Sequence, residues 1–260
     1  MDAFDRRWYA DPRQHGEDYF LLYFPPAILE KTAWQVEGLV RLLELPAGAR
    51  VLDLACGWGR VAVPLAQRGY RVTGLDLSEA FLAMARKSAR AAGVDIDFRH
   101  ADMREIPFVG EFDAVIMMWT AFGLLESDEE DEKVLHAVAR ALRPGGRFFL
   151  DQASREWVIR HHRGRDWAER EGGILVLQKR ELDLVESRNY VRLTIIEPDG
   201  SRRVHHHVFR FYTLTELVGM LARAGLAFRA AWGAFDGSPY TLESRRMIVL
   251  AEKGERVGNG

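Results

Sequence analysis

The stretch Val51-Leu52-Asp53-Leu54-Ala55-Cys56-Gly57-Trp58-Gly59-Arg60 decides the fold of this chain. Its apolar beginning predicts a buried strand over residues 49–54, and the pattern that follows predicts a helix over residues 60–68. The loop between them is built from small residues, so a ligand can come close to its backbone. Such a loop also directs free N–H groups and a helix dipole at an anion. A Gly-x-Gly loop alone is a weak signal, because any tight turn between a strand and a helix uses glycine.

Strand and helix signals alternate through the rest of the chain. Strands are predicted at residues 70–75, 95–99, 113–118, 147–151, 227–232 and 246–251, and helices at 28–43, 79–92, 128–142 and 214–224. Strands that alternate with helices of this length form a parallel sheet, and continuously apolar strands have helices on both faces. The predicted fold class is therefore α/β, with a doubly wound sheet.

Residues 155–212 depart from this alternation. Three stretches in this region alternate like strands and are joined by turn compositions, at 174–185, 190–197 and 202–212. We therefore predict an antiparallel β meander inserted after the fifth strand, which serves as a lid or as a homodimer surface. The chain then divides into an N-terminal aromatic-rich cap segment and helix (1–44), a main α/β domain (45–154 and 213–253) and the inserted meander (155–212).

Composition excludes several classes of protein. The 36 basic and 38 acidic residues give a formal charge of −2, which supplies no cationic field for nucleic acid or anionic lipid and disfavours both partners. Cys56 is the one cysteine, which excludes a disulfide framework and a zinc site of several cysteines. The longest charge-free apolar stretch, 114–125, is shorter than the about 18–20 residues of a membrane span. The charged N-terminus predicts no secretory signal, so we expect a cytoplasmic protein.

A second ligand signal lies at the end of the next strand, in Gly74-Leu75-Asp76. An acid at that position is placed to accept both hydroxyls of a ribose, which implies a nucleoside ligand. The dinucleotide fingerprint is G-x-G-x-x-G, whereas this loop has Ala55 at the first glycine position and no third glycine. A nicotinamide-dependent oxidoreductase is therefore the alternative hypothesis rather than the leading one.

Five segments, in order, resemble the motifs of the class I S-adenosylmethionine (SAM)-dependent methyltransferases. They are Asp53-x-Ala55-Cys56-Gly57-x-Gly59-Arg60, Gly74-Leu75-Asp76-Leu77-Ser78, Ala101-Asp102-Met103, Phe112-Asp113-Ala114-Val115-Ile116-Met117-Met118 and Ala141-Leu142-Arg143-Pro144-Gly145-Gly146-Arg147. The resemblance covers residues 46–151 well and the C-terminal part more loosely. It implies a Rossmann-like, SAM-binding domain with a seven-stranded, mostly parallel sheet whose last strand is antiparallel.

The chain is most similar to the small-molecule branch of this family, which includes the glycine, sarcosine and aminosugar N-methyltransferases. That branch also carries an antiparallel insertion after the fifth strand and an aromatic-rich N-terminal segment that closes over the cofactor. Methylases of nucleic-acid amino groups usually have Asn/Asp-Pro-Pro-Tyr after the fourth strand, where this chain has Trp119-Thr120-Ala121-Phe122. The resemblance implies methyl transfer to a small-molecule amine or hydroxyl, and an RNA or protein methyltransferase stays as an alternative.

The resemblance also implies the residues that hold the cofactor. Asp76 is expected at the ribose, and Asp102 and Met103 at the adenine. Asp53 is expected to organise the loop or to meet the amino group of the ligand, and Ala55 replaces a more usual glycine. The full set of expected cofactor-binding residues is Asp53, Ala55, Gly57, Gly59, Asp76, Leu77, Asp102, Met103 and Met118.

The catalytic residues are less well defined. Transfer from a sulfonium is an in-line displacement, so the enzyme mainly aligns the reactants, and a base matters only for a protonated acceptor. The aromatic residues near the expected acceptor are weak candidates for catalysis: Tyr9, Tyr19, Trp119 and Tyr240. They are equally suited to packing. In the run at 205–207 only two histidines share a strand face, so no metal is expected.

Overall fold

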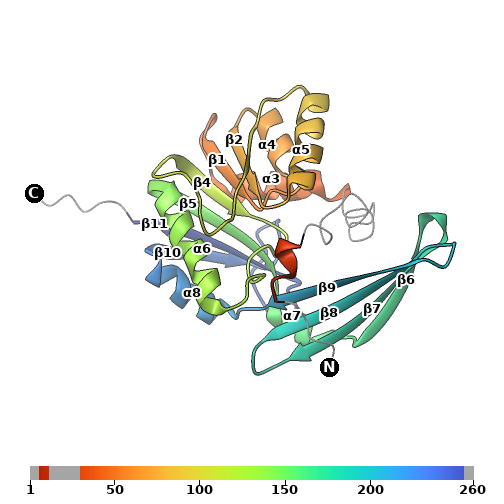
Figure 1. Ribbon diagram of the computed structural model, residues 1–260. Helices are drawn as coiled ribbons and strands as arrows, with labels where there is room; N and C mark the ends of the chain where they lie inside the picture. Colours follow the sequence, from red (N-terminus) through yellow and green to blue (C-terminus); the bar gives the residue numbers. More distant parts are fainter. Residues whose placement is uncertain (1–5, 12–29, 255–260) are drawn as a thin grey trace, which may run out of the picture.

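A central sheet of seven strands organises the molecule. The computed structural model describes residues 6–11 and 30–254. The strands lie in the order β10-β11-β5-β4-β1-β2-β3 (Figure 1). Their bounds are β1 (Arg50–Leu54), β2 (Arg71–Asp76), β3 (Asp97–His100), β4 (Phe112–Met117), β5 (Leu142–Ala153), β10 (Leu226–Trp232) and β11 (Arg246–Lys253). Strands β3, β2, β1, β4 and β5 pair in parallel, whereas β11 is antiparallel to both neighbours. The predicted doubly wound, mostly parallel sheet is confirmed.

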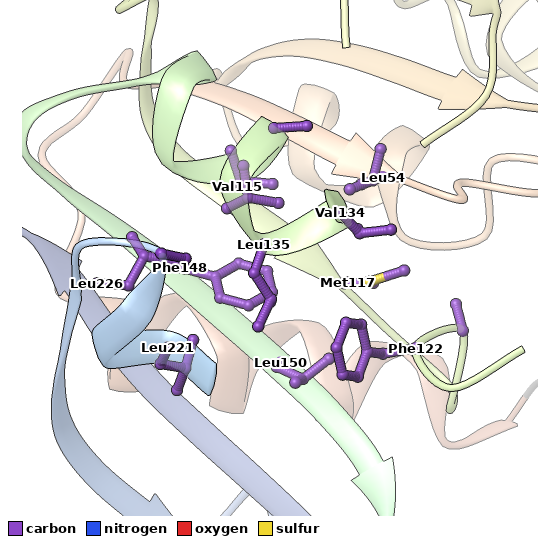
Figure 2. Packing of buried hydrophobic residues seen from close by; sticks show 14 of the residues in the cluster. Leu54, Val115, Met117, Phe122, Val134, Leu135, Phe148, Leu150, Leu221 and Leu226 are labelled. Atoms are coloured by element: carbon purple, nitrogen blue, oxygen red, sulfur yellow. The ribbon is translucent and has the colours of Figure 1, made fainter. Parts of the chain in front are cut away.

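Helices cover both faces of this sheet. One face carries α3 (Thr32–Leu43), α4 (Ala62–Gln67) and α5 (Glu79–Ala92), and the other carries α6 (Asp128–Ala141) and α8 (Leu214–Arg223). Alternate residues of each strand enter two separate apolar cores, because successive side chains point to opposite faces. In the core shown in Figure 2, Leu135 of α6 and Leu221 of α8 pack on Phe148 of β5, and all three are fully buried. Truncating such a leucine to alanine costs about 2–5 kcal/mol.

Helices α5 and α6 each begin at a serine that caps the helix N-terminus. The Ser78 hydroxyl accepts a hydrogen bond from the backbone N–H of Phe81, and α5 ends at Gly93, whose φ is 67°. Ser127 caps α6 in the same way, and four acidic residues follow in its first turn. Acidic side chains there are stabilised by the positive end of the helix dipole. These local signals fix where both helices start beside the strand tips.

The insertion forms a sheet of its own, with one strand more than the sequence predicts. Its elements are α7 (Arg155–Arg160), β6 (Arg165–Arg170), η3 (Glu171–Gly173), β7 (Ile174–Asp183), β8 (Arg188–Ile196) and β9 (Arg202–Arg210). The strand order is β6-β7-β8-β9, all antiparallel. The three predicted strands are present as β7, β8 and β9. The prediction missed β6 because it is an exposed edge strand, Arg165-Asp166-Trp167-Ala168-Glu169-Arg170, without apolar alternation.

Ionic and phenolic contacts attach this second sheet to α6. Just after β9, the hydroxyl of Tyr212 donates to Asp131 across 2.8 Å, and the Arg210 guanidinium contacts both carboxylate oxygens of Asp128 at 3.1 Å. The short helix η1 (Trp8–Ala10) lies against the same sheet, because the indole N–H of Trp8 donates to the carbonyl of Val208. The insertion and this N-terminal piece thus meet near the strand tips (Figure 1). None of the helices described is long and apolar enough to cross a membrane.

Candidate active site

A cavity of about 240 Å³ opens at the carboxyl ends of the central strands. Residues that follow β1, β2, β3 and β4 line it, together with η1 and β9. The chain winds outward in one direction from β1 and in the other from β4, and ligands of open α/β sheets bind at this reversal. The fold therefore places the motif residues around one space.

The loop after β1 has a left-handed backbone at three positions. The φ angles are 58° at Ala55, 54° at Gly57 and 82° at Gly59. This explains the glycine that is more usual at position 55, since alanine tolerates such a φ less well than glycine. Gly57 lines the cavity, and a Cβ there would meet nothing within 4 Å. At Gly59 a Cβ would stand 3.3 Å from the Cβ of Ala85, so this glycine lets the loop approach α5.

Asp76, the last residue of β2, holds the loop in place. Its carboxylate accepts hydrogen bonds from the backbone N–H of Gly57 at 2.7 Å and of Ser78 at 2.8 Å. A carboxylate has about four lone-pair sites, so these two bonds leave acceptor capacity for further donors. Asp76 also lines the cavity. It can therefore hold the loop and accept ligand hydroxyls together.

Asp102, after β3, is paired with Arg104, a residue that sequence reasoning missed. Arg104 donates to both carboxylate oxygens of Asp102 and extends to Glu130 at 2.6 Å. Burial raises the pKa of Asp102, but the hydrogen bonds from Arg104 outweigh burial and hold the pKa below its ordinary value. The carboxylate is therefore ionised at neutral pH. Met103 beside it also lines the cavity.

Asp53, in β1, is the most deeply buried acid of the cavity wall. It is 2% exposed, and burial raises its pKa to about 7 despite the opposing charge of Arg60. Within the described residues its Oδ2 has no hydrogen-bond partner. A buried, unpartnered carboxylate oxygen is costly unless a donor is supplied. The site thus leaves an acceptor for a cationic or N–H group of a ligand.

Aromatic side chains also line the cavity. Trp119 follows β4 with a φ of 64°, and its backbone N–H donates to Asp151 at 3.1 Å. Trp8 and Tyr9 come from η1 and Phe209 from β9. The Tyr9 hydroxyl donates to Glu126 at 2.8 Å, and burial raises the pKa of Tyr9 to about 12. Tyr9 is therefore a neutral phenol at physiological pH.

The structure brings most of the sequence candidates to the cavity. Eight of them expected at the cofactor line it: Asp53, Ala55, Gly57, Asp76, Leu77, Asp102, Met103 and Met118. Gly59 does not, because it packs against α5. Of the catalytic candidates, Tyr9 and Trp119 line the cavity, and Tyr19 falls outside the described residues. Tyr240 is not part of the wall; its hydroxyl donates to Glu156 at 2.5 Å.

Among the wall residues to which sequence reasoning gave no role are Trp8, Arg60 and Phe209. Arg60 carried a signal, since it directly follows the glycine loop. Trp8 belonged to an aromatic N-terminal run without a clean period. Phe209 carried no such signal, because no local sequence pattern indicates that β9, which lies about 150 residues beyond the loop, lines the same cavity.

Comparison with known proteins gives the class of this chain. Residues 51–146 match the family model described as a methyltransferase domain. A SAM-dependent methyltransferase from Clostridium acetobutylicum shares the fold, with a TM-score of 0.78 at 16% identity over 91% of this chain and 97% of that one. Residues 51–146 are thus a methyltransferase domain, and the sheet and the motifs at its strand tips have the arrangement of the class I SAM-dependent methyltransferases.

Two further proteins show how far the similarity extends. The cypemycin N-terminal methyltransferase of a Streptomyces species is 28% identical over 251 residues, covering 88% of this chain and 98% of that protein. The sugar N-methyltransferase KedS8 of Streptoalloteichus has a TM-score of 0.71 at 23% identity, over 92% of this chain and 94% of that one. Similarity to methyltransferases therefore reaches well beyond residues 51–146.

Proposed function

We propose that this methyltransferase transfers a methyl group from SAM to an amine or hydroxyl group of a small-molecule acceptor. The observation that carries the proposal is the composition of the cavity wall. Asp76 and Asp102 lie at the tips of neighbouring strands, and Trp8, Tyr9 and Trp119 line the same cavity. The carboxylates suit an adenosine, and the aromatic rings suit a cationic sulfonium and its acceptor.

The residues present fit the cofactor. Asp76 retains lone pairs for the ribose hydroxyls, Asp102 is an ionised acceptor for the adenine amino group, and the buried Oδ2 of Asp53 awaits a donor. Gly57 leaves open space over the loop backbone. When bound, SAM supplies an electrophilic methyl group on a sulfonium. These groups would hold it by its adenosine and amino-acid ends.

The protein's own contribution to the reaction is alignment and exclusion of water. Holding two reactants in line contributes about 7–11 kcal/mol to lowering a barrier. Trp8, Tyr9 and Phe209 reach the cavity from segments outside the central sheet, so they cover the space where an acceptor would lie. With a pKa of about 12, Tyr9 is unsuited to remove a proton at pH 7. An amine that arrives neutral attacks the methyl group without a base.

The favoured acceptor atom is the nitrogen of an amine. One similar protein is named a cypemycin N-terminal methyltransferase and another a sugar N-methyltransferase. Because the first name specifies an N-terminus, a peptide α-amine is the second candidate acceptor. The homodimer through the insertion and the cytoplasmic location expected from the sequence are untested and stay predictions.

Two measurements test the proposal. Titration calorimetry should show binding of SAM and of its demethylated product, S-adenosylhomocysteine, but not of NADH. Incubation with SAM and a panel of amino sugars, amino acids, short peptides and matched alcohols should yield S-adenosylhomocysteine and an acceptor heavier by one methylene, read by mass spectrometry. Binding of NADH in place of SAM would favour the oxidoreductase, and methylation of alcohols only would exclude the amine preference.

A further inference from the structure

The guanidinium of Arg60 is only partly satisfied. Arg60 lines the cavity wall yet is 9% exposed. Its Nη1 donates to Oε1 of Gln35 at 2.6 Å and to the hydroxyl of Thr32 at 3.0 Å, both on α3. Its Nη2 is buried and has no hydrogen-bond partner anywhere in residues 6–11 and 30–254. A buried donor without an acceptor is unfavourable, so this position calls for an acceptor that the described chain does not supply.

The guanidinium is held rigidly and stays charged. It lies over the ring of Trp119, 4.8 Å from the ring centre, and the Trp119 indole N–H donates to the same Gln35 oxygen at 3.3 Å. Burial lowers the pKa of Arg60 to about 10, although Asp151 and Asp53 act against burial. Arg60 is therefore a cation at neutral pH. Its orientation is fixed before any ligand binds.

The strand order shows which part of the cofactor would lie beside Arg60. The tips follow one another as β3, β2, β1 and β4. Asp102 after β3 and Asp76 at the end of β2 suit the adenine and the ribose. The amino-acid end then falls beside the loop after β1, where Arg60 and Asp53 both line the cavity.

We propose that Arg60 binds the α-carboxylate of the methionine part of SAM through Nη2, while Asp53 receives the α-amino group. A guanidinium matches a carboxylate in charge and in planar geometry. Nη2 of Arg60 and Oδ2 of Asp53 are both buried and have no hydrogen-bond partner among the described residues. They are opposite in hydrogen-bonding character, as the two ends of an amino-acid zwitterion require. The inference rests on the proposed function and adds Arg60 as the residue that binds the α-carboxylate of SAM.

Decarboxylated SAM, which lacks only the carboxylate, tests the proposal on the unaltered protein. Calorimetry should show that it binds roughly 10- to 100-fold more weakly than SAM, the loss expected for one charge-assisted hydrogen bond. Equal affinities for the two ligands would overturn the role of Arg60 and leave the proposed function standing. Binding of neither ligand would overturn the proposed function itself.

A pair of variants assigns the discrimination to Arg60. In Arg60→Met, SAM should bind roughly 10- to 100-fold more weakly while decarboxylated SAM changes less than about threefold. Arg68→Met is the matched control, because Arg68 lies just after α4, as Arg60 lies just before it. Among the described residues its guanidinium donates only to the Pro64 carbonyl, so the substitution should change neither affinity. Equal weakening of both ligands in Arg60→Met would show that Arg60 only holds Trp119 and the loop, which contradicts the proposal.

Discussion

Asp76 and Gly57 join two strand tips: the carboxylate at the end of β2 accepts the backbone N–H of the loop after β1 across 2.7 Å. One side chain thus shapes the loop and faces the cavity. The glycine loop and the acid are 19 residues apart in sequence, and their contact exists because β1 and β2 are parallel neighbours. Loss of this acid should therefore affect both the loop and the ligand.

Asp76→Ala should abolish detectable binding of S-adenosylhomocysteine, a loss of at least about 100-fold. The substitution removes the acceptors for the ribose hydroxyls. It also leaves the backbone N–H groups of Gly57 and Ser78 without their acceptor, and each lost hydrogen bond costs about 1–3 kcal/mol. Calorimetry measures the affinity. Asp97→Ala, on exposed β3 in a pair with Arg99, is the control and should bind normally. An Asp76 variant that binds within threefold of the unaltered protein contradicts the assignment.

Asp53 should make the protein less stable as the pH rises. Its pKa in the folded state, about 7, is raised by burial above the ordinary value near 4, so folding favours the protonated form. The stabilisation is complete below pH 4 and is lost as the pH rises through 7. Asp53→Asn should remove this dependence, so its Tm should exceed that of the unaltered protein by more at pH 8 than at pH 5. A pH-independent difference would refute the raised pKa.

Ala55→Gly should leave stability within about 1 kcal/mol of the unaltered protein and should retain cofactor binding. Relief of the left-handed φ of 58° offsets the greater flexibility of glycine in the unfolded chain. Ala83→Gly, on the exposed face of α5, is the matched control and should cost about 1 kcal/mol. Urea unfolding compares the two. If both substitutions cost the same, the loop does not hold Ala55 in a left-handed conformation.

Tyr212→Phe should destabilise the attachment of the insertion by about 1–3 kcal/mol, because it removes a donor to the fully buried Asp131. Tyr190→Phe removes a hydroxyl that donates to Glu186 at an exposed position and should cost less than about 0.5 kcal/mol. Chemical denaturation gives both values. Equal losses would mean that the Tyr212 hydroxyl contributes no more than a surface contact.

Tyr9→Phe should keep methyl transfer within about tenfold. The phenol is neutral and donates to Glu126, so its hydroxyl serves position rather than proton removal. Removal of a general base typically costs 10²–10⁴-fold. The profile of kcat against pH should keep its shape in the variant. A loss above 10³-fold, with a changed profile, would make Tyr9 a catalytic residue.

Local sequence accounted for the central sheet because its signals are local. A continuous apolar strand such as Phe112–Met117 can be buried only between two layers, and residues such as Ser78 and Gly93 mark helix ends by their own backbone chemistry. The same reasoning missed β6, in which charged residues stand where an alternating apolar pattern would mark a strand. An edge strand is defined by its partner, β7, rather than by its own composition.

By itself the sequence determined the sheet, the loop after β1 and the acids at the ends of β2 and β3, since periodicity and backbone conformation act over a few residues. Tertiary structure alone decided which distant groups share the cavity. Phe209 and Trp8 reach it from an insertion and an N-terminal helix, and Tyr240 bonds Glu156 instead. Arg60 lies in the quoted motif, yet its guanidinium is buried only once α3 and Trp119 have packed around it, which leaves Nη2 without a partner among the described residues. Contacts between segments far apart in the chain are set by packing, which no local pattern encodes.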